Sequence, residues 1–193
     1  MTTPTKILAF AGSNRKDSLN KRLVRIAAQG AEEVGAKVTL IDLREFPLPL
    51  YDGDLEAAEG LPESATNLKR LMVQHDGLLI ASPEYNSSIA SLLKNAIDWA
   101  SRPAANEPPL AAYKNKVATL LSASPGALGG LRGLVHLRAI LGNIGVIVLP
   151  DQIAVPKAHE AFAPDGSLVD PKQHTAVKGL GVTLAKFLAK VKA

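Results

Sequence analysis

The chain has 193 residues, of which 47% are apolar and 21% charged, and this size and composition are typical of one globular domain with a full-sized core. It contains no cysteine, which excludes disulfides, thiolate catalysis, cysteine-ligated zinc and iron–sulfur clusters. The 22 Lys and Arg against 18 Asp and Glu give a net charge of +4, which favours an acidic small ligand. We therefore expect a single domain over residues 1–193.

Neither end of the sequence carries a membrane or nucleic-acid signal. The stretch MTTPTK and the five-residue apolar run after it are too short for a secretion signal, and no run approaches the roughly 18 apolar residues of a membrane span. The C-terminal lysines share one helical face, which is typical of a solvated surface, and only 4% of residues are aromatic. We expect a cytoplasmic protein with no membrane and no nucleic-acid partner.

Two periodicities alternate along the chain. Short, nearly continuous apolar runs, typical of strands buried on both faces, occupy residues 6–11, 37–42, 76–82, 116–122 and 146–149. Between and after them, apolar residues at helical spacing run from Leu19 to Val34, from Ile89 to Ala100, from Leu131 to Leu141 and from Val177 to Val191. This alternation predicts a doubly wound α/β domain with five parallel strands.

Three unusual polar loops follow the first, third and fourth of these strands. They read GSNRKDSLN at 12–20, SPEYNSS at 82–88 and SASPGALGGLR at 122–132. Because the carboxyl ends of parallel strands meet at one edge of a sheet, we expect a ligand site there. Two longer stretches, 46–62 and 151–171, lack periodicity and are expected to be surface loops.

The first of these loops has the features of an anion site. A helix that begins near Ser18 offers unpaired N–H groups and the positive end of its dipole. Hydroxyls of Ser13 and Ser18, the amide of Asn20 and the guanidinium of Arg15 would add donors around a phosphate. The loop has a single glycine, so it is neither a Rossmann fingerprint nor a P-loop. The alternative is that Ser18 is only a helix cap and that Arg15 is a solvated side chain.

The segments GSNRKDSLNKRL, PEYNSSIASLLKNAIDWASR and SASPGALGGLR resemble the NADPH-dependent FMN reductase family of flavodoxin-like proteins, which includes chromate, quinone and azo reductases. The middle segment is the most specific, because the family commonly reads P-E-Y-N, then two residues with the second a serine, then L-K-N-A-x-D-W. The chain departs from the family pattern at Ser87, Ala90 and Ser91, where relatives often have an aromatic residue or glycine, then proline and glycine. These departures bear on the ring pocket and on substrate preference.

The resemblance implies a flavodoxin-like five-stranded parallel sheet of order 2-1-3-4-5 with helices on both faces. It implies FMN as the cofactor, NADPH or NADH as the electron donor, and a homodimer or homotetramer with the flavin near a subunit boundary. Carried over by position, the phosphate would be held by Ser13, Arg15, Ser18 and Asn20 and by backbone amides around Leu19. Pro83, Glu84, Tyr85 and Asn86 would lie along the isoalloxazine, with Ser124 and Gly126 at its pyrimidine edge.

Several of these residues also have structural interpretations. Tyr85 would otherwise be a surface aromatic in a turn, and Asn86 an Asx turn or a helix cap. Asp98 and Trp99 are expected to be structural, with Trp99 in the core or at a subunit contact. The four histidines, His75, His136, His159 and His174, show no metal-ligand spacing, so no metal site is expected.

The resemblance implies an enzyme that passes electrons from NAD(P)H to a small oxidant, such as a quinone, free flavin, an azo compound or chromate. We expect no catalytic side chain, because the flavin carries the redox chemistry, and we expect ping-pong kinetics. Two alternatives remain open at this point. One is a flavodoxin-type electron carrier, and the other is a regulatory module that binds FMN or phosphate without redox chemistry.

Overall fold

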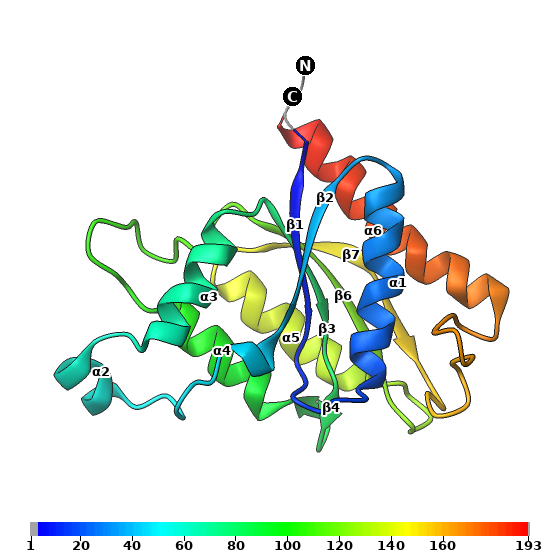
Figure 1. Cartoon of the computed structure of the whole chain (residues 1–193), viewed down its shortest axis with the longest axis horizontal. Helices are drawn as coiled ribbons and strands as arrows, with labels where there is room; N and C mark the ends of the chain where they lie inside the picture. Colours follow the sequence, from blue (N-terminus) through cyan, green and yellow to red (C-terminus); the bar gives the residue numbers. More distant parts are fainter. Residues whose placement is uncertain (1–3, 193) are drawn as a thin grey trace.

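A five-stranded parallel sheet forms the centre of the computed structural model, which describes residues 4–192. The strands lie in the order β2-β1-β3-β6-β7, and every neighbouring pair is parallel (Figure 1). This is the flavodoxin-like order 2-1-3-4-5, so the predicted fold class is confirmed. The strand bounds are β1 (Lys6–Ala11), β2 (Lys37–Asp42), β3 (Gly77–Ala81), β6 (Val117–Ala123) and β7 (Ile147–Val155).

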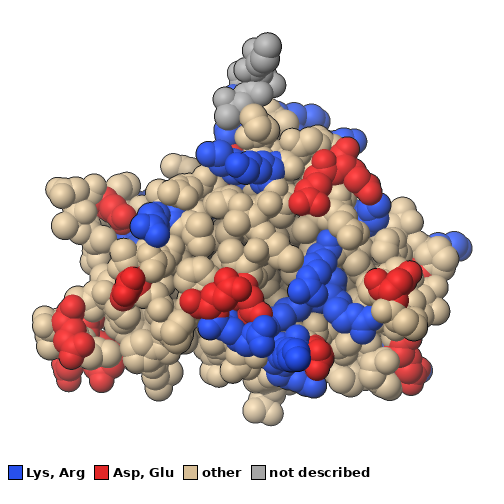
Figure 2. Space-filling model, in the orientation of Figure 1, with Lys and Arg blue, Asp and Glu red and all other residues tan. Residues whose placement is uncertain are grey.

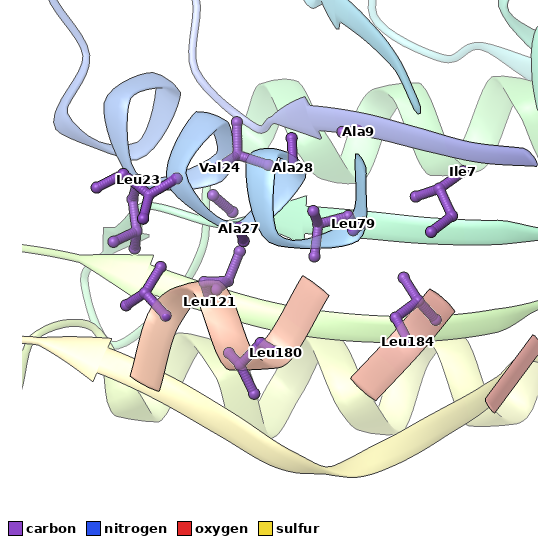
Figure 3. Close-up of a cluster of buried hydrophobic side chains, with 14 of the residues drawn as sticks. Ile7, Ala9, Leu23, Val24, Ala27, Ala28, Leu79, Leu121, Leu180 and Leu184 are labelled. Atoms are coloured by element: carbon purple, nitrogen blue, oxygen red, sulfur yellow. The ribbon is translucent and has the colours of Figure 1, made fainter. Parts of the chain in front are cut away.

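Successive side chains of a strand point to opposite faces of the sheet, and both faces are covered by helices. On one face, Ile7 and Ala9 pack in a cluster with apolar residues of α1 and α6 (Figure 3). On the other face, Leu8 and Phe10 pack in a cluster with residues of α3, α4 and α5. The helix bounds are α1 (Leu19–Glu33), α3 (Glu63–Val73), α4 (Ser91–Ser101), α5 (Leu131–Asn143) and α6 (Pro171–Val191).

The helices α1 and α6 approach each other through glycines. A Cβ atom added at Gly181 would overlap the carbonyl oxygen of Ala27, and one added at Gly30 would overlap the carbonyl oxygen of Lys178. Both glycines therefore let the two backbones meet with no side chain between them. This contact fixes the position of α1, whose N-terminus lies at the candidate site.

The stretch 46–62 is not the structureless loop expected from the sequence. It follows a 3-10 helix, η1 (Leu43–Glu45), and contains the helix α2 (Gly53–Glu59), which is capped by the Asp52 carboxylate at 2.8 Å from the Asp54 N–H. None of the seven described residues of α2 is buried, so it has no apolar stripe for the sequence to reveal. The helix α3 that follows was not among the predicted elements, although it buries Leu68 and Met72.

The stretch 151–171 departs from the expectation of a loop only at its start, because β7 runs on to Val155, while residues 156–170 connect β7 to α6 as an irregular loop. The apolar run ends at Leu149, where Pro150 and Asp151 interrupt it, and β7 changes register against β6 at the same place. The Arg138 guanidinium donates to the carbonyl oxygens of Val148 and Pro150 at 3.2 Å and stabilises this irregular segment. Ile89 likewise lies in a short strand rather than in a helix, and α4 begins at Ser91.

Candidate functional site

The three polar loops meet at one edge of the sheet, as the sequence predicts. The Gly12 N–H, just beyond β1, donates to the Ala81 carbonyl oxygen at 2.9 Å. The Ser82 N–H, just beyond β3, donates to the Leu121 carbonyl oxygen at 2.8 Å. These bonds link the ends of β1, β3 and β6 directly, so the loops that follow them form one continuous surface.

The first loop, residues 12–18, places two buried hydroxyls at the N-terminus of α1. Ser13 and Ser18 are both 5% exposed, whereas Arg15 is exposed and donates its backbone N–H to the Ser13 hydroxyl at 3.3 Å. Within residues 4–192 the Ser18 side chain makes no capping bond and the first turn of α1 holds no acidic residue. The hydroxyls, the unpaired N–H groups and the positive helix end are the donor set that a phosphate requires, so the loop fits this group of FMN.

The polar atoms of the Asn20 side chain are bonded to the protein backbone and not left open to a phosphate. Its Nδ2 donates to the Ala123 carbonyl oxygen at 2.9 Å, and its Oδ1 accepts from the Ala123 N–H at 2.9 Å. The side chain is 4% exposed and ties α1 to the end of β6, so only its backbone N–H belongs to the helix terminus. Leu19, the first residue of α1, is half-buried against the core and also offers its backbone at this terminus. Asn20 therefore holds the first and third loops together.

The second loop folds into a β-hairpin with a two-residue turn. Strand β4 (Glu84–Tyr85) pairs antiparallel with β5 (Ser88–Ile89), which leaves Asn86 and Ser87 as the turn, with φ of 50° and 66°. Positive φ at both turn residues is the pattern of a type I′ turn, which asparagine tolerates and serine does not favour. Pro83 is buried at the base of the hairpin, and Tyr85 is 50% exposed on it. Tyr85 and Asn86 therefore stand at the accessible end of the site.

The Glu84 side chain is bonded to the start of α5. Its carboxylate accepts from the Gly133 N–H at 2.9 Å and from the Arg132 guanidinium at 3.3 Å. Its side chain is 10% exposed and satisfies the first turn of α5, which otherwise begins at Gly130 with φ of 93° and no side-chain cap. Glu84 thus anchors the hairpin to α5, and its backbone remains the part that can face a ligand.

Several backbone donors of the third loop, residues 124–130, are bonded to the loop itself or to β7. The Ser124 N–H donates to the Val155 carbonyl oxygen at 3.1 Å, and the Gly126 N–H donates to the Ser124 hydroxyl at 3.3 Å. The Gly126 bond is long, so a better acceptor could replace it. Sequence reasoning missed Gly129 and Gly130, which both have positive φ. A Cβ at Gly130 would overlap the Ser122 hydroxyl, and the paired glycines before a helix were the signal for this tight turn.

Two cations beside the first loop, Lys21 and Arg44, are already paired. The Lys21 ammonium in α1 donates to Asp42, at the end of β2, at 2.8 Å, and the Arg44 guanidinium donates to the same carboxylate at 2.7 Å. Burial alone would raise the pKa of Asp42, but the hydrogen bonds from Arg44 and Lys21 outweigh it and hold that pKa well below its usual range. Lys21 is therefore neutralised by Asp42, and Arg15 and Lys16, both exposed, remain the cations that the phosphate loop can offer a ligand.

The four histidines are spread over the molecule. His75 bonds to the Leu71 carbonyl oxygen and the Thr39 hydroxyl, and His136 bonds to the Ser88 hydroxyl at 2.9 Å. His159 lies beside Glu160, and His174 accepts from the Leu168 N–H at 3.2 Å. Among residues 4–192 no group of three or more His, Asp or Glu side chains could hold a metal ion. Trp99 is fully buried and donates to the Pro49 carbonyl oxygen at 2.8 Å, so its predicted core role is confirmed.

Comparison with known proteins assigns the chain to a family. The family model described as NADPH-dependent FMN reductase matches residues 5–160, which include all three loops. The chain belongs to this family. As a member of the NADPH-dependent FMN reductase family it is an oxidoreductase enzyme that uses FMN and NAD(P)H.

Several relatives in the family match nearly the whole chain. The quinone reductase of Escherichia coli is 32% identical over 197 aligned positions, which cover 100% of both chains. The NAD(P)H-dependent FMN reductase of Pseudomonas aeruginosa is 35% identical and covers 92% of each chain. Among solved structures, FerB of Paracoccus denitrificans, a flavoenzyme NAD(P)H:(acceptor) oxidoreductase, is 31% identical with a TM-score of 0.78 and covers 96% of this chain and 98% of its own. Within residues 4–192, no helix has the length and hydropathy required to cross a membrane.

Proposed function

We propose that this enzyme transfers electrons from NAD(P)H to quinones by a ping-pong mechanism. The observation that carries the proposal is the convergence of the three loops at one sheet edge in a chain that matches the quinone reductase of Escherichia coli end to end. The rice relative named probable NADPH:quinone oxidoreductase 2, 32% identical over 96% of this chain, supports the same acceptor class. When bound, FMN supplies the redox chemistry by accepting a hydride from the nicotinamide and passing electrons to the acceptor.

The first loop of this chain would hold the FMN phosphate. The buried hydroxyls of Ser13 and Ser18 and the backbone amides of Leu19 and Asn20 surround the α1 N-terminus, and the Arg15 side chain is close enough in sequence to cover it. Charge-assisted hydrogen bonds of this kind are stronger than neutral ones, so most of the anchoring comes from this loop. The Asn20 side chain contributes indirectly, because its bonds to Ala123 keep the first loop beside the third.

The other two loops would orient the ring and admit the substrates. The hairpin base at Pro83 and the backbone of Glu84 would lie along one side, with the half-exposed Tyr85 and Asn86 at the opening. A hollow of about 430 Å³ lies against this hairpin, and its lining includes Tyr85, Ile89 and Ile140. Ser124 and Gly126 would supply polar groups to the pyrimidine edge, where preorganised donors stabilise developing negative charge. No side chain of the chain is required as an acid, base or nucleophile.

Steady-state kinetics tests the proposed function. The purified holoprotein should oxidise NADPH or NADH with benzoquinones, and double-reciprocal plots at several fixed quinone concentrations should be parallel. Intersecting lines would contradict the ping-pong mechanism. A yellow protein that NADPH does not bleach would be an electron carrier, and a colourless protein that takes up no FMN would be a binding module; either result would overturn the proposal. Free flavin, azo compounds and chromate are the further acceptors to compare.

We also propose a homodimer or homotetramer of single-domain chains, located in the cytoplasm. Support for assembly comes from exposed apolar side chains close to the hairpin, because patches of this kind commonly mark subunit contacts. Leu128 is 49% exposed, Leu131 42% and Val135 56%, and they lie in and before α5, to which Glu84 anchors the hairpin. Light scattering of the holoprotein would test the assembly.

A further inference from the structure

A groove of about 720 Å³ runs beside α1, from the end of the first loop, where Lys16, Asp17 and Ser18 line it, to the segment 164–167. One wall is the face of α1 that carries Ser18, Arg22, Arg25 and Gln29, which are spaced so that they share one side of the helix. The opposite wall is the segment 164–167 together with His174 of α6. By the rise of an α-helix, the groove extends about 16 Å along α1 from the phosphate loop. It therefore begins at the candidate flavin site and leads away from it.

The groove is polar and carries several cations. Among its lining residues only Ile26 and Pro164 have apolar side chains, so the groove does not suit an apolar quinone. Its lining includes three cations, Lys16, Arg22 and Arg25, and two carboxylates, Asp17 and Asp165. Figure 2 shows Lys and Arg side chains gathered over α1 and the loop that precedes it. The lining therefore favours a negatively charged, hydrophilic ligand.

The two arginines of the groove differ in how they are held. The Arg22 guanidinium donates to the Ala163 carbonyl oxygen at 2.6 Å and lies 4.7 Å from the centroid of the Phe162 ring, so it fixes the opposite wall in place. Arg25 is exposed and has no hydrogen-bond or ion-pair partner among residues 4–192. Arg25 is thus a cation available to a ligand, and the opposite wall of the groove is held in place by the contacts of Arg22.

The carboxylates do not cancel this positive field. Asp165 accepts from the Ser167 N–H at 2.9 Å and from the Ser167 hydroxyl at 2.7 Å, so protein donors compensate part of its charge. Asp17 is exposed to solvent at the end of the groove nearest the phosphate loop. His174 uses its Nδ1 as an acceptor for the Leu168 N–H, which leaves its Nε2 as a further donor.

We propose that the groove beside α1 binds the phosphate monoester of a nucleotide substrate, with Arg25 as the residue that recognises it. A phosphate monoester carries close to two negative charges at neutral pH and matches the planar donors of an arginine guanidinium. Two substrates of the proposed reaction carry this group: NADPH, as the adenosine 2′-phosphate, and free FMN used as an acceptor. The inference rests on the proposed function, and it makes Arg25 a determinant of substrate choice rather than of flavin retention.

The kinetic test compares Arg25→Glu with the control Arg70→Glu, which reverses the charge of another exposed helical arginine, on α3 and outside the groove. If NADPH is the ligand, Arg25→Glu should raise the KM for NADPH about tenfold or more, on the scale of a lost charge-assisted bond. The KM for NADH should stay within about twofold, because NADH lacks the phosphate. If free FMN is the ligand, the KM for FMN as acceptor should rise while that for riboflavin does not.

A binding measurement on the holoprotein tests the proposal independently of enzyme turnover. Calorimetric titration with 2′,5′-ADP should show binding that Arg25→Glu weakens about tenfold and Arg70→Glu leaves unchanged. The control probe NAD⁺, which carries no phosphate monoester, should bind the wild type and the Arg25 variant equally. Loss of free-FMN binding with unchanged 2′,5′-ADP binding would assign the groove to the flavin substrate instead.

These experiments distinguish a failure of this inference from a failure of the proposed function. If the holoprotein reduces quinones and neither NADPH nor free FMN distinguishes Arg25→Glu from Arg70→Glu, the groove does not recognise a phosphate monoester and the inference is overturned. If the holoprotein has no reductase activity, the proposed function fails, while the titration with 2′,5′-ADP still reports on the groove.

Discussion

Arg15 lies exposed in the first loop, and its backbone, not its guanidinium, is bonded to Ser13. Because Lys21 is already paired with Asp42, Arg15→Ala should remove one of the two loop cations, Arg15 and Lys16, that have no side-chain partner among residues 4–192. We expect FMN binding to weaken by about one to two orders of magnitude, with a smaller dependence on salt. Fluorescence titration of FMN into the apoprotein measures this change. Arg70→Ala is the control, and an unchanged dissociation constant for Arg15→Ala would remove Arg15 from the phosphate site.

Ser87 is the second turn residue of the β4–β5 hairpin and has a φ of 66°. A side chain in this left-handed region is strained, whereas glycine adopts it freely. Ser87→Gly should therefore raise the free energy of unfolding by about 0.5 to 1 kcal/mol, as measured by urea denaturation. The control is Gly60→Ala, which places a side chain at φ 75° in open space and should lower stability. A destabilised Ser87→Gly would show that its side chain contributes more than the strain costs.

At the scale of elements, the packing of α1 against α6 fixes the position of the α1 N-terminus, at which the phosphate loop ends. The buried side chains of both helices pack into one cluster with β1, β3 and β6, as Figure 3 shows for Leu23, Leu180 and Leu184. The glycines at positions 30 and 181 allow this packing because each lies against a backbone carbonyl of the partner helix. The N-terminus of α1 is thus held by a contact made well away from the site.

Gly181→Ala should be strongly destabilising for this reason. The new Cβ would overlap the Ala27 carbonyl oxygen, and overpacking of this kind costs about 1 to 3 kcal/mol. Gly179→Ala, in the same helix, is the matched control, because its Cβ would meet no atom of the described residues within 4 Å. That control should be neutral or stabilising by up to about 1 kcal/mol. Thermal unfolding of both variants gives the comparison, and equal effects would contradict the close approach of the two helices.

At the scale of the whole molecule, the charge distribution should influence the reaction of the enzyme with its electron donor. The net charge is +4, and Lys and Arg side chains gather over α1 beside the candidate site (Figure 2). An anionic nicotinamide nucleotide should therefore be steered toward this surface, and screening by salt should weaken the effect. We expect kcat/KM for NADPH to fall as the ionic strength is raised from low to physiological, by up to about tenfold.

A neutral benzoquinone provides the internal control for this effect. In a ping-pong reaction the kcat/KM for each substrate belongs to its own half-reaction, so the value for the quinone should change little with salt. Parallel losses for both substrates would indicate a general salt effect on the protein instead.

Local patterns in the sequence were sufficient for the five central strands and for the place of the site. β1 and β2 begin and end where their apolar runs do, and the three polar loops come directly after buried strands. The α2 helix and the extension of β7 were not predicted, because one buries none of its described residues and the other contains Pro150 and Asp151. The cap of α2 by Asp52 is local, but its Glu56 also accepts from Arg102 at 2.8 Å, and β7 pairs with the distant β6; periodicity reports neither of these contacts.

The sequence by itself determined the doubly wound fold and the three loops, because buried strands, amphipathic helices and polar turns each leave a short-range pattern. Only the tertiary structure decided what individual side chains do there. Asn20 bonds to Ala123, Glu84 bonds to the start of α5, and Arg22 bonds to Ala163, and in each pair the partners are far apart in the chain. A hydrogen bond or a groove between such segments depends on how the chain is packed in three dimensions, and a single sequence carries no local signal for that.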